Sequence, residues 1–276
     1  MNIYYSSLNQ IGIPVQESLK NIIQSGGTAV ELLLDGAEWN EFNLRTREFA
    51  RLLSGLPLQY SVHTPVWDIN LTSENAQARQ AAIDAYRSSI VFAAAVHAEH
   101  VVIHPGFCYA SVFRKETARK RAAQAIEELC RFNAPYRVPL LVENVGTAKT
   151  SIFTQEEYIG FIEGFGGRIG SLLDVGHAHL CGWDLPQTIG RLNPYLFAVH
   201  FHDNNGDEDF HLPIGEGSIP WPSVYRSLRE CRPELRLVLE YEIGTPMKKL
   251  MEGSALLARA FPNEFGLPRP ASGFGS

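Results

Sequence analysis

The sequence predicts an α/β fold, a single (β/α)8 barrel of the TIM-barrel type. Short apolar segments alternate with longer amphipathic segments along all 276 residues. Most of the apolar segments are unbroken, which is typical of parallel strands covered on both faces. The length also fits, because such barrels have roughly 250 residues. A doubly wound open sheet is the alternative, but no GxGxxG phosphate-binding pattern follows the first strand.

Eight strands are expected in chain order, at residues 3–5, 30–34, 60–63, 101–104, 139–143, 170–174, 196–200 and 237–240. Helices are expected between them, at residues 17–25, 73–96, 117–132, 154–163, 185–192, 220–231 and 247–260. Gly26 and Gly27 end the first of these helices, Ser73 can cap the second, and Pro220 suits a first helical turn. The barrel domain is expected to span residues 1–262, followed by a flexible tail at 263–276.

Composition excludes several classes of protein. The chain has 24 Lys and Arg against 30 Asp and Glu, so it has none of the basic excess of most nucleic-acid-binding proteins. No apolar run approaches the ~18 residues that a membrane span needs, and the first residues do not resemble a secretory signal. The four cysteines lie far apart without a CxxC pair, which favours a reduced, cytoplasmic protein.

Polar side chains end six of the expected strands. Each apolar run from the third strand onward finishes on a potential metal ligand, namely His63, His104, Glu143, Asp174, His200 and Glu240. The carboxyl ends of all strands in a (β/α)8 barrel meet on one face, where the active site lies. Carboxylates gathered there would repel one another unless a cation or protons neutralised them. The mixture of carboxylates and imidazoles therefore predicts a site for a divalent ion such as Zn²⁺ or Mn²⁺.

Further candidates flank these strand ends. Gly176 permits a tight turn between Asp174 and His177, and Asp209 and His211 would point the same way on an extended backbone. His202 follows His200 on the same strand face, which suggests contact with a ligand residue or with substrate. Aromatic side chains that could exclude water are Trp67, Trp183 and Phe107. The remaining histidines are expected to be structural or on the surface: His97, His100 and His179.

Seven short segments, in order, resemble the xylose isomerase-like superfamily of barrels. This superfamily includes sugar isomerases, sugar epimerases and the endonuclease IV type of abasic-site endonuclease. The segments are 62–65 (VHTP), 103–106 (IHPG), 142–144 (VEN), 173–177 (LDVGH), 199–203 (VHFHD), 211–217 (HLPIGEG) and 239–240 (LE).

The resemblance implies two different ligand sets. In the isomerase and epimerase branch, the residues at four matching positions bind one divalent ion: Glu143, Asp174, His200 and Glu240. In the endonuclease branch a trinuclear zinc site uses nine ligands, and all nine have counterparts here. The five additional ones are His63, His104, His177, Asp209 and His211.

Other features favour a small sugar over DNA. Residues 35–41 (DGAEWNE) are acidic where a DNA-binding protein would meet phosphate, and residues 67–71 (WDINL) contain no Arg or Lys. Phe210 stands where the endonuclease pattern Asp-Arg-His has its arginine. Residues 217–221 (GSIPW) are similar to a Gly-x-Ile-x-Trp run of the isomerase-like branch.

The resemblance thus implies an isomerase or epimerase of a ketose or keto-sugar. One ion of Mn²⁺, Zn²⁺ or Co²⁺ would chelate the substrate carbonyl, and Glu143 and Glu240 would serve as the acid–base pair. His177 could hydrogen-bond the developing oxyanion. The alternative is an abasic-site endonuclease with up to three Zn²⁺. A dehydratase, or a barrel that only binds sugar or metal, is also compatible with this resemblance. Members of this superfamily often pair, so a homo-oligomer is possible.

Overall fold

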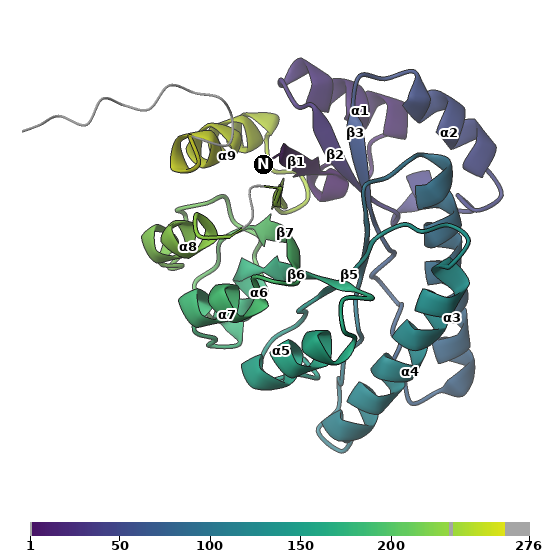
Figure 1. Ribbon diagram of the computed structural model, residues 1–276. Helices are drawn as coiled ribbons and strands as arrows, with labels where there is room; N and C mark the ends of the chain where they lie inside the picture. Colours follow the sequence, from purple (N-terminus) through teal and green to yellow (C-terminus); the bar gives the residue numbers. More distant parts are fainter. Residues whose placement is uncertain (1, 232–233, 263–276) are drawn as a thin grey trace, which may run out of the picture.

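A computed structural model describes residues 2–231 and 234–262. Eight parallel strands form a closed barrel in sequence order, and β1 pairs with both β2 and β8 (Figure 1). The strands are β1 (Asn2–Ser6), β2 (Ala29–Leu33), β3 (Gln59–His63), β4 (Val101–Ile103), β5 (Leu140–Glu143), β6 (Gly170–Asp174), β7 (Leu196–Phe201) and β8 (Arg236–Leu239). The predicted (β/α)8 barrel is confirmed, with all eight strands at the expected places.

Helices surround the barrel and cover its outer face (Figure 1). They are α1 (Val15–Gln24), α2 (Thr46–Ser54), α3 (Ala76–Ala95), α4 (Lys115–Asn133), α5 (Gln155–Gly164), α6 (Val175–Leu180), α7 (Leu185–Leu192), α8 (Trp221–Leu228) and α9 (Met247–Ala260). Two 3-10 turns, η1 (Ser7–Gln10) and η2 (Ala37–Trp39), follow β1 and β2. The seven predicted helices are present, whereas α2 and α6 were not predicted. Among the described residues, none of the helices is long and apolar enough to span a bilayer.

Two residues predicted to begin helices have different roles. The cap of α3 is Asn75 rather than Ser73, because the Asn75 side chain accepts hydrogen bonds from the backbone N–H groups of Gln77 and Ala78. Pro220 precedes α8 instead of lying in its first turn, and Pro222 occupies that turn. The predicted tail at 263–276 lies outside the described residues.

Side chains alternate between the two faces of the strands, and this alternation separates two apolar layers. Val62, Val142 and Leu173 point outward and join the main core between sheet and helices. Four fully buried residues, one on each of β4, β5, β6 and β7, form a separate cluster: Val102, Leu141, Leu172 and Ala198. Because side chains two positions apart lie on one face of a strand, the polar residues two positions later stand directly above this inner cluster.

Candidate metal centre

The strand ends bring the predicted ligands together in the barrel interior. His104, Glu143, Asp174 and His200 each lie two residues beyond a member of the inner apolar cluster, and Glu240 lies two beyond buried Val238. Parallel pairing also aligns β6 with β7, so that Asp174 and His200 are directly opposite each other. The polar side chains therefore form a layer at the carboxyl ends of the strands, on an apolar floor.

An inner group of four buried side chains could hold a metal ion. One donor atom from each lies within 4.8 Å of the others, and the members are Glu143, Asp174, His200 and Glu240. The Nδ1 atom of His200 lies 3.0 Å from Glu240 Oε2, 3.5 Å from Glu143 Oε1 and 3.6 Å from Asp174 Oδ2. This buried nitrogen makes no hydrogen bond of suitable geometry despite its short distance to Glu240, which leaves it as a potential ligand atom for a cation.

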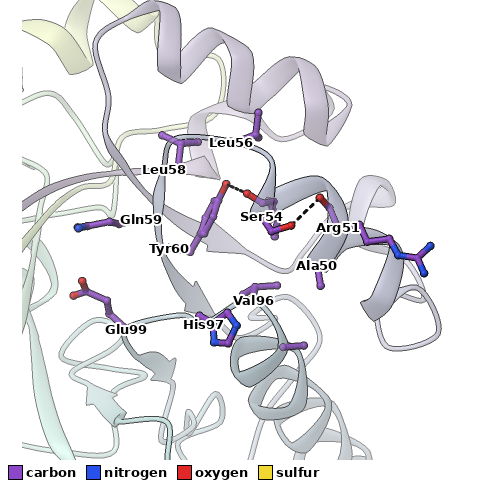
Figure 2. Close-up of a pocket in the computed structure, with 12 residues that line it drawn as sticks. Ala50, Arg51, Ser54, Leu56, Leu58, Gln59, Tyr60, Val96, His97 and Glu99 are labelled. Atoms are coloured by element: carbon purple, nitrogen blue, oxygen red, sulfur yellow. Dashed lines mark hydrogen bonds between the residues drawn. The ribbon is translucent and has the colours of Figure 1, made fainter.

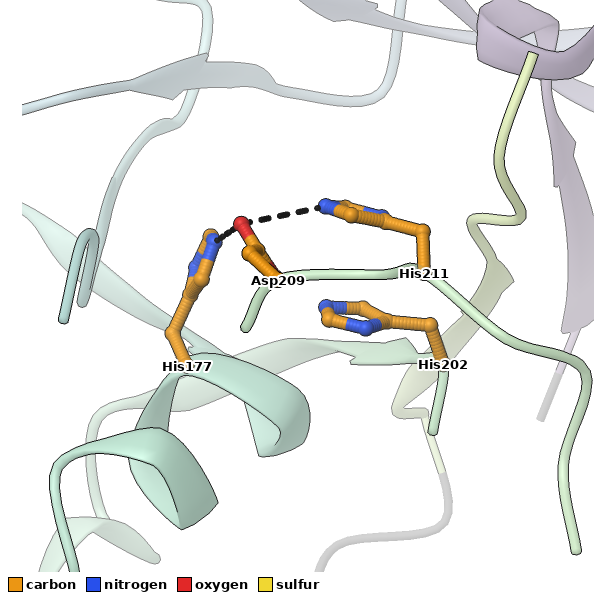
Figure 3. A group of neighbouring side chains, drawn as sticks. All are labelled: His177, His202, Asp209 and His211. Carbon is orange, nitrogen blue, oxygen red and sulfur yellow. Dashed lines mark hydrogen bonds and ion pairs between the residues drawn. The ribbon is translucent and has the colours of Figure 1, made fainter. Parts of the chain in front are cut away.

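Two further groups adjoin the inner group. The side group consists of His63, His104 and Glu143, in which Oε2 of Glu143 lies 3.2 Å and 3.1 Å from the two Nε2 atoms. The outer group consists of His177, His202, Asp209 and His211 (Figure 3). All ten predicted ligand candidates therefore fall into these three groups, and Glu143 belongs to two of them.

Asp209 lies between two histidines in the outer group (Figure 3). Its Oδ2 is 2.9 Å from His177 Nε2 and 3.5 Å from His211 Nε2. The expected extended backbone is not present, because His211 has a φ of 43°, in the left-handed region that most residues avoid. His202 stacks on His211 with ring centroids 3.8 Å apart, and its Nε2 lies 3.0 Å from both carboxylate oxygens of Asp174.

Three histidines are hydrogen-bonded in a way that directs their Nε2 atoms toward a possible cation site. Nδ1 of His63 faces the carbonyl of Thr64 at 2.8 Å, Nδ1 of His177 faces that of Asn144 at 3.1 Å, and Nδ1 of His211 faces that of Glu240 at 3.1 Å. A carbonyl only accepts, so each Nδ1 carries the proton. Each Nε2 then faces a carboxylate, and that contact is favourable only with a second proton or a metal ion between the two atoms.

Protons neutralise the carboxylates when no ion is bound. Burial alone would raise the pKa of Glu143, but His104 and His200 hold it well below its usual value. Burial would likewise lower the pKa of His200, yet the carboxylates of Glu240, Glu31 and Glu143 raise it well above the ordinary value. Burial lowers the pKa of His104, so this imidazole can accept an ion without releasing a proton.

This protonation predicts how the metal-free protein responds to pH. Burial opposes the charged form of His63 and His211, but Glu143 and Asp209 respectively raise their pKa values from 6.5 to about 9. Their stabilisation of the fold is complete below pH 6.5 and is lost as the pH rises through about 9. We expect the melting temperature of EDTA-treated protein to fall by several degrees over this window. The melting temperature of Zn²⁺-loaded protein should fall less over the same window. An equal fall of the melting temperature in both forms would contradict this account.

Local structure fixes the position of Asp174. It ends β6 and also caps α6, because its Oδ1 accepts the backbone N–H of His177 at 2.6 Å. The Asn144 side chain donates to the Asp174 carbonyl and accepts its N–H at 2.9 and 2.8 Å, which ties the ends of β5 and β6 together. Gly176 lies inside α6 rather than in a turn, and a Cβ there would overlap the His202 ring.

A buried carboxylate organises the loop that carries the outer group. Asp203 accepts four hydrogen bonds, from the backbone N–H groups of Asn204, Gly215 and Ile219 and from Nε1 of Trp221, at 2.7–3.1 Å. A Cβ at Gly217 would overlap the same carboxylate. The HLPIGEG and GSIPW segments therefore wrap around Asp203, and this packing accounts for Gly217, whereas Gly215 has a φ of 88° that favours glycine.

Replacing Asp203 by Asn should destabilise the protein by about 3 kcal/mol, since bonds to a charged acceptor contribute about 1.5–3 kcal/mol each. The new amide would also turn a donor toward backbone donors. Urea unfolding measures the change. Asp207→Asn is a control in the same loop, because Asp207 is exposed and, among the described residues, accepts a single hydrogen bond from the N–H of Glu208. Equal unfolding midpoints for the two variants would refute the role of Asp203.

Three buried polar residues of this region were not predicted. Glu31 lies in the middle of β2 with apolar neighbours on both sides. Asn144 directly follows Glu143, and Asp203 directly follows His202. Only Glu31 gave a usable signal, because a charge inside an apolar strand is rarely buried without a partner. His100, expected to be structural or on the surface, is buried with its Nε2 3.4 Å from Glu31.

A cavity of about 240 Å³ opens over the three groups. Its polar side contains His63, His104, Glu143, His177, Asp209, His211 and Glu240. Its apolar side contains Leu8, Leu33, Val66, Trp67, Phe107 and Tyr109. Trp67 and Phe107 thus line the cavity as expected, whereas Trp183 packs against Tyr158. None of the lining residues is a Lys or Arg.

A larger cavity of about 520 Å³ lies elsewhere (Figure 2). It is formed by the end of α2, the start of β3 and the end of α3, which places it toward the amino ends of the strands. Its lining is largely apolar, with His97 and Glu99 at one side. The residues lining it form none of the three groups of potential metal ligands, which all adjoin the smaller cavity.

The chain is similar to known proteins both in sequence and in structure. The uncharacterized protein MJ1614 of Methanocaldococcus jannaschii is 28% identical over 203 residues, 73% of this chain and 76% of that protein. The probable endonuclease 4 of Thermoplasma volcanium is 27% identical over 198 residues, 66% and 68% of the two chains. The crystal structure of a D-tagatose 3-epimerase-like protein matches with a TM-score of 0.82 and 21% identity, over 96% of this chain and 99% of that one.

The match to a family extends over most of the barrel. The family model described as a xylose isomerase-like TIM barrel matches residues 19–260. This range includes seven of the eight strands and every member of the three ligand groups. The chain therefore belongs to the xylose isomerase-like TIM-barrel family.

Proposed function

We propose that this chain is a metal-dependent isomerase or epimerase of a small ketose or keto-sugar. The observation that carries the proposal is the inner group, whose four buried donors converge and two of whose members, Glu143 and Glu240, line the cavity. Glu143, Asp174, His200 and Glu240 would hold one divalent ion, either Mn²⁺, Zn²⁺ or Co²⁺. Such an ion acts as a Lewis acid that polarises a bound carbonyl and makes the adjacent C–H bond more acidic.

Glu143 and Glu240 would transfer the proton. They lie at the ends of β5 and β8, which are not neighbours in the barrel, so their carboxylates approach the cavity from different sides. One would remove a proton from the carbon beside the carbonyl, and the other would return a proton to the opposite face or to the next carbon. His177 lines the same cavity and would hydrogen-bond the oxygen on which charge develops.

The cavity favours a small uncharged substrate. Its volume of about 240 Å³ lies below the range of roughly 300–1,000 Å³ usual for drug-sized ligands. The lining contains no Lys or Arg, so a phosphate group would find neither an ammonium nor a guanidinium group there. The apolar side of the cavity would contact the carbon face of a sugar, while the polar side would meet its oxygens.

The side and outer groups support a second candidate, hydrolysis of phosphodiesters at abasic sites by up to three Zn²⁺. They supply the additional ligands that such a site needs, and one relative is named a probable endonuclease 4. The acidic segment 35–41 weighs against a DNA duplex beside the cavity. We therefore rank this activity second, and a dehydratase acting by the same proton abstraction remains a variant of the first.

Metal content and substrate assays separate the candidates. The protein should be reconstituted with Mn²⁺, Co²⁺ or Zn²⁺ and its ion content measured by elemental analysis. Each form should then be tested on a panel of ketoses in D₂O, where deuterium enters the substrate at the reacting carbon, and on duplex DNA with one abasic site. Ketose exchange supports our proposal. Nicking of the DNA by a form with three zinc ions, without ketose exchange, would replace it with the second candidate.

A further inference from the structure

We propose that Glu31 is a positioning residue, which holds His200 with Nδ1 directed at the inner group and so strengthens metal binding there. This inference rests on the proposed metal centre and adds a residue outside its ligand set. Glu31 is absent from the residues that line the cavity, so it would act only through His200.

The contact between Glu31 and His200 crosses the barrel. Glu31 belongs to β2 and His200 to β7, which are separated by β1 and β8 on one side of the closed sheet. Glu31 Oε1 lies 2.7 Å from His200 Nε2, and both side chains are completely buried. A contact this short between two buried polar groups from non-adjacent strands fixes the orientation of the imidazole ring.

Other groups hold the carboxylate in place. Ser61 donates a hydrogen bond from Oγ to Glu31 Oε2 at 3.1 Å, and Nε2 of His100 lies 3.4 Å from the same oxygen. Oε1 is left to accept from His200. The carboxylate therefore has one oxygen for its supporting residues and the other for the ligand residue.

The consequence for His200 follows from its tautomer. Because Oε1 accepts, Nε2 keeps a proton, and Nδ1, which faces the three carboxylates of the inner group, is the nitrogen that can donate its lone pair to an ion. His63, His177 and His211 show the opposite arrangement, with Nδ1 on a neutral backbone carbonyl and Nε2 toward a carboxylate. The protonated nitrogen of His200 thus has a carboxylate at 2.7 Å as its nearest partner, whereas the nearest partner of Nδ1 in these three is a carbonyl, and in His177 the Glu143 carboxylate is further away at 3.4 Å. A carboxylate partner makes the imidazole a stronger donor.

Glu31→Gln tests the inference with a nearly isosteric change. Affinity for Zn²⁺ and Mn²⁺ can be measured by competition with a fluorescent chelator, and circular dichroism reports whether the variant is folded. We expect the tightest ion to bind roughly 10–100-fold more weakly, which is the usual cost of losing such a partner. Glu99→Gln is the control, because Glu99 is a partly exposed carboxylate that pairs with Arg236 away from the ligands. The Glu99→Gln variant should bind Zn²⁺ and Mn²⁺ with wild-type affinity.

Two measurements keep the test valid if Glu31→Gln does not fold. Ser61→Ala removes one support of the carboxylate and should weaken the tightest ion by a few-fold. The second measurement is NMR of wild-type protein with ¹⁵N-labelled histidine and bound ¹¹³Cd²⁺. The most tightly bound ¹¹³Cd²⁺ should show scalar coupling to the Nδ1 atom of one imidazole, and the Nε2 atom of that imidazole should be protonated. Coupling only through Nε2, or unchanged affinity in folded Glu31→Gln, would overturn the inference alone. Absence of ion binding by wild type would overturn the proposed metal centre as well.

Discussion

Replacing Glu143 by Gln should lower turnover by at least about 10³-fold. Its carboxylate belongs to both the inner and the side group, with Oε1 3.5 Å from His200 Nδ1 and Oε2 within 3.2 Å of His63 and His104. General acid–base catalysis alone contributes about 10²–10⁴-fold, and a neutral amide supplies neither the base nor an anionic ligand. The variant should therefore lose chemistry and metal affinity together.

The structure also predicts that this variant folds. Glu143 ends β5, and its amide would keep nearly the same volume above the inner apolar cluster. Turnover and ion content should be compared with those of Glu163→Gln, an exposed glutamate in α5. Turnover within tenfold of wild type in the Glu143 variant would show that this carboxylate is neither base nor essential ligand. It would thereby refute the two-glutamate mechanism.

The strands and their polar ends could be predicted because one simple pattern encodes both. In 101–104, 139–143 and 196–200, an apolar run ends on a His or Glu, and closure of the barrel then brings these ends together. Helix α2 gave a weaker signal, since its preceding residue Arg45 makes no side-chain cap and only Phe49 and Leu53 are buried. Helix α6 starts directly at the end of β6, where no loop marks its beginning.

The partners of the ligands could not be predicted, because they depend on contacts across the barrel. Glu31 meets a histidine 169 residues away, and no periodicity in β2 indicates that distance. Asp209 and His211 were expected to lie close together on an extended backbone. They do lie close together, but the positive φ of His211 brings them there. Local pattern thus identifies the residues of a site, whereas tertiary contacts determine which of them touch.

Removing the metal with EDTA should lower the melting temperature by roughly 8–16 °C. An ion present at ~1,000 times its Kd stabilises a protein by about 4.1 kcal/mol, and each kcal/mol corresponds to about 2–4 °C for a chain near this size. The protein should nevertheless stay folded, because protonated histidines can replace the ion: Glu143 and Asp209 raise the pKa values of His63 and His211 to about 9.

The same exchange predicts that metal binding releases protons. At pH 7.5, an ion entering the side or outer group must displace the second proton of His63 or His211. Calorimetric titration of the EDTA-treated protein with Zn²⁺, in two buffers of different ionisation enthalpy, gives the number released. One ion in the inner group displaces the proton of His200, whose pKa is also raised, whereas three ions should release several protons. Binding without proton release would mean that these histidines do not exchange protons for a metal, and an unchanged melting temperature after EDTA would contradict stabilisation by a bound ion.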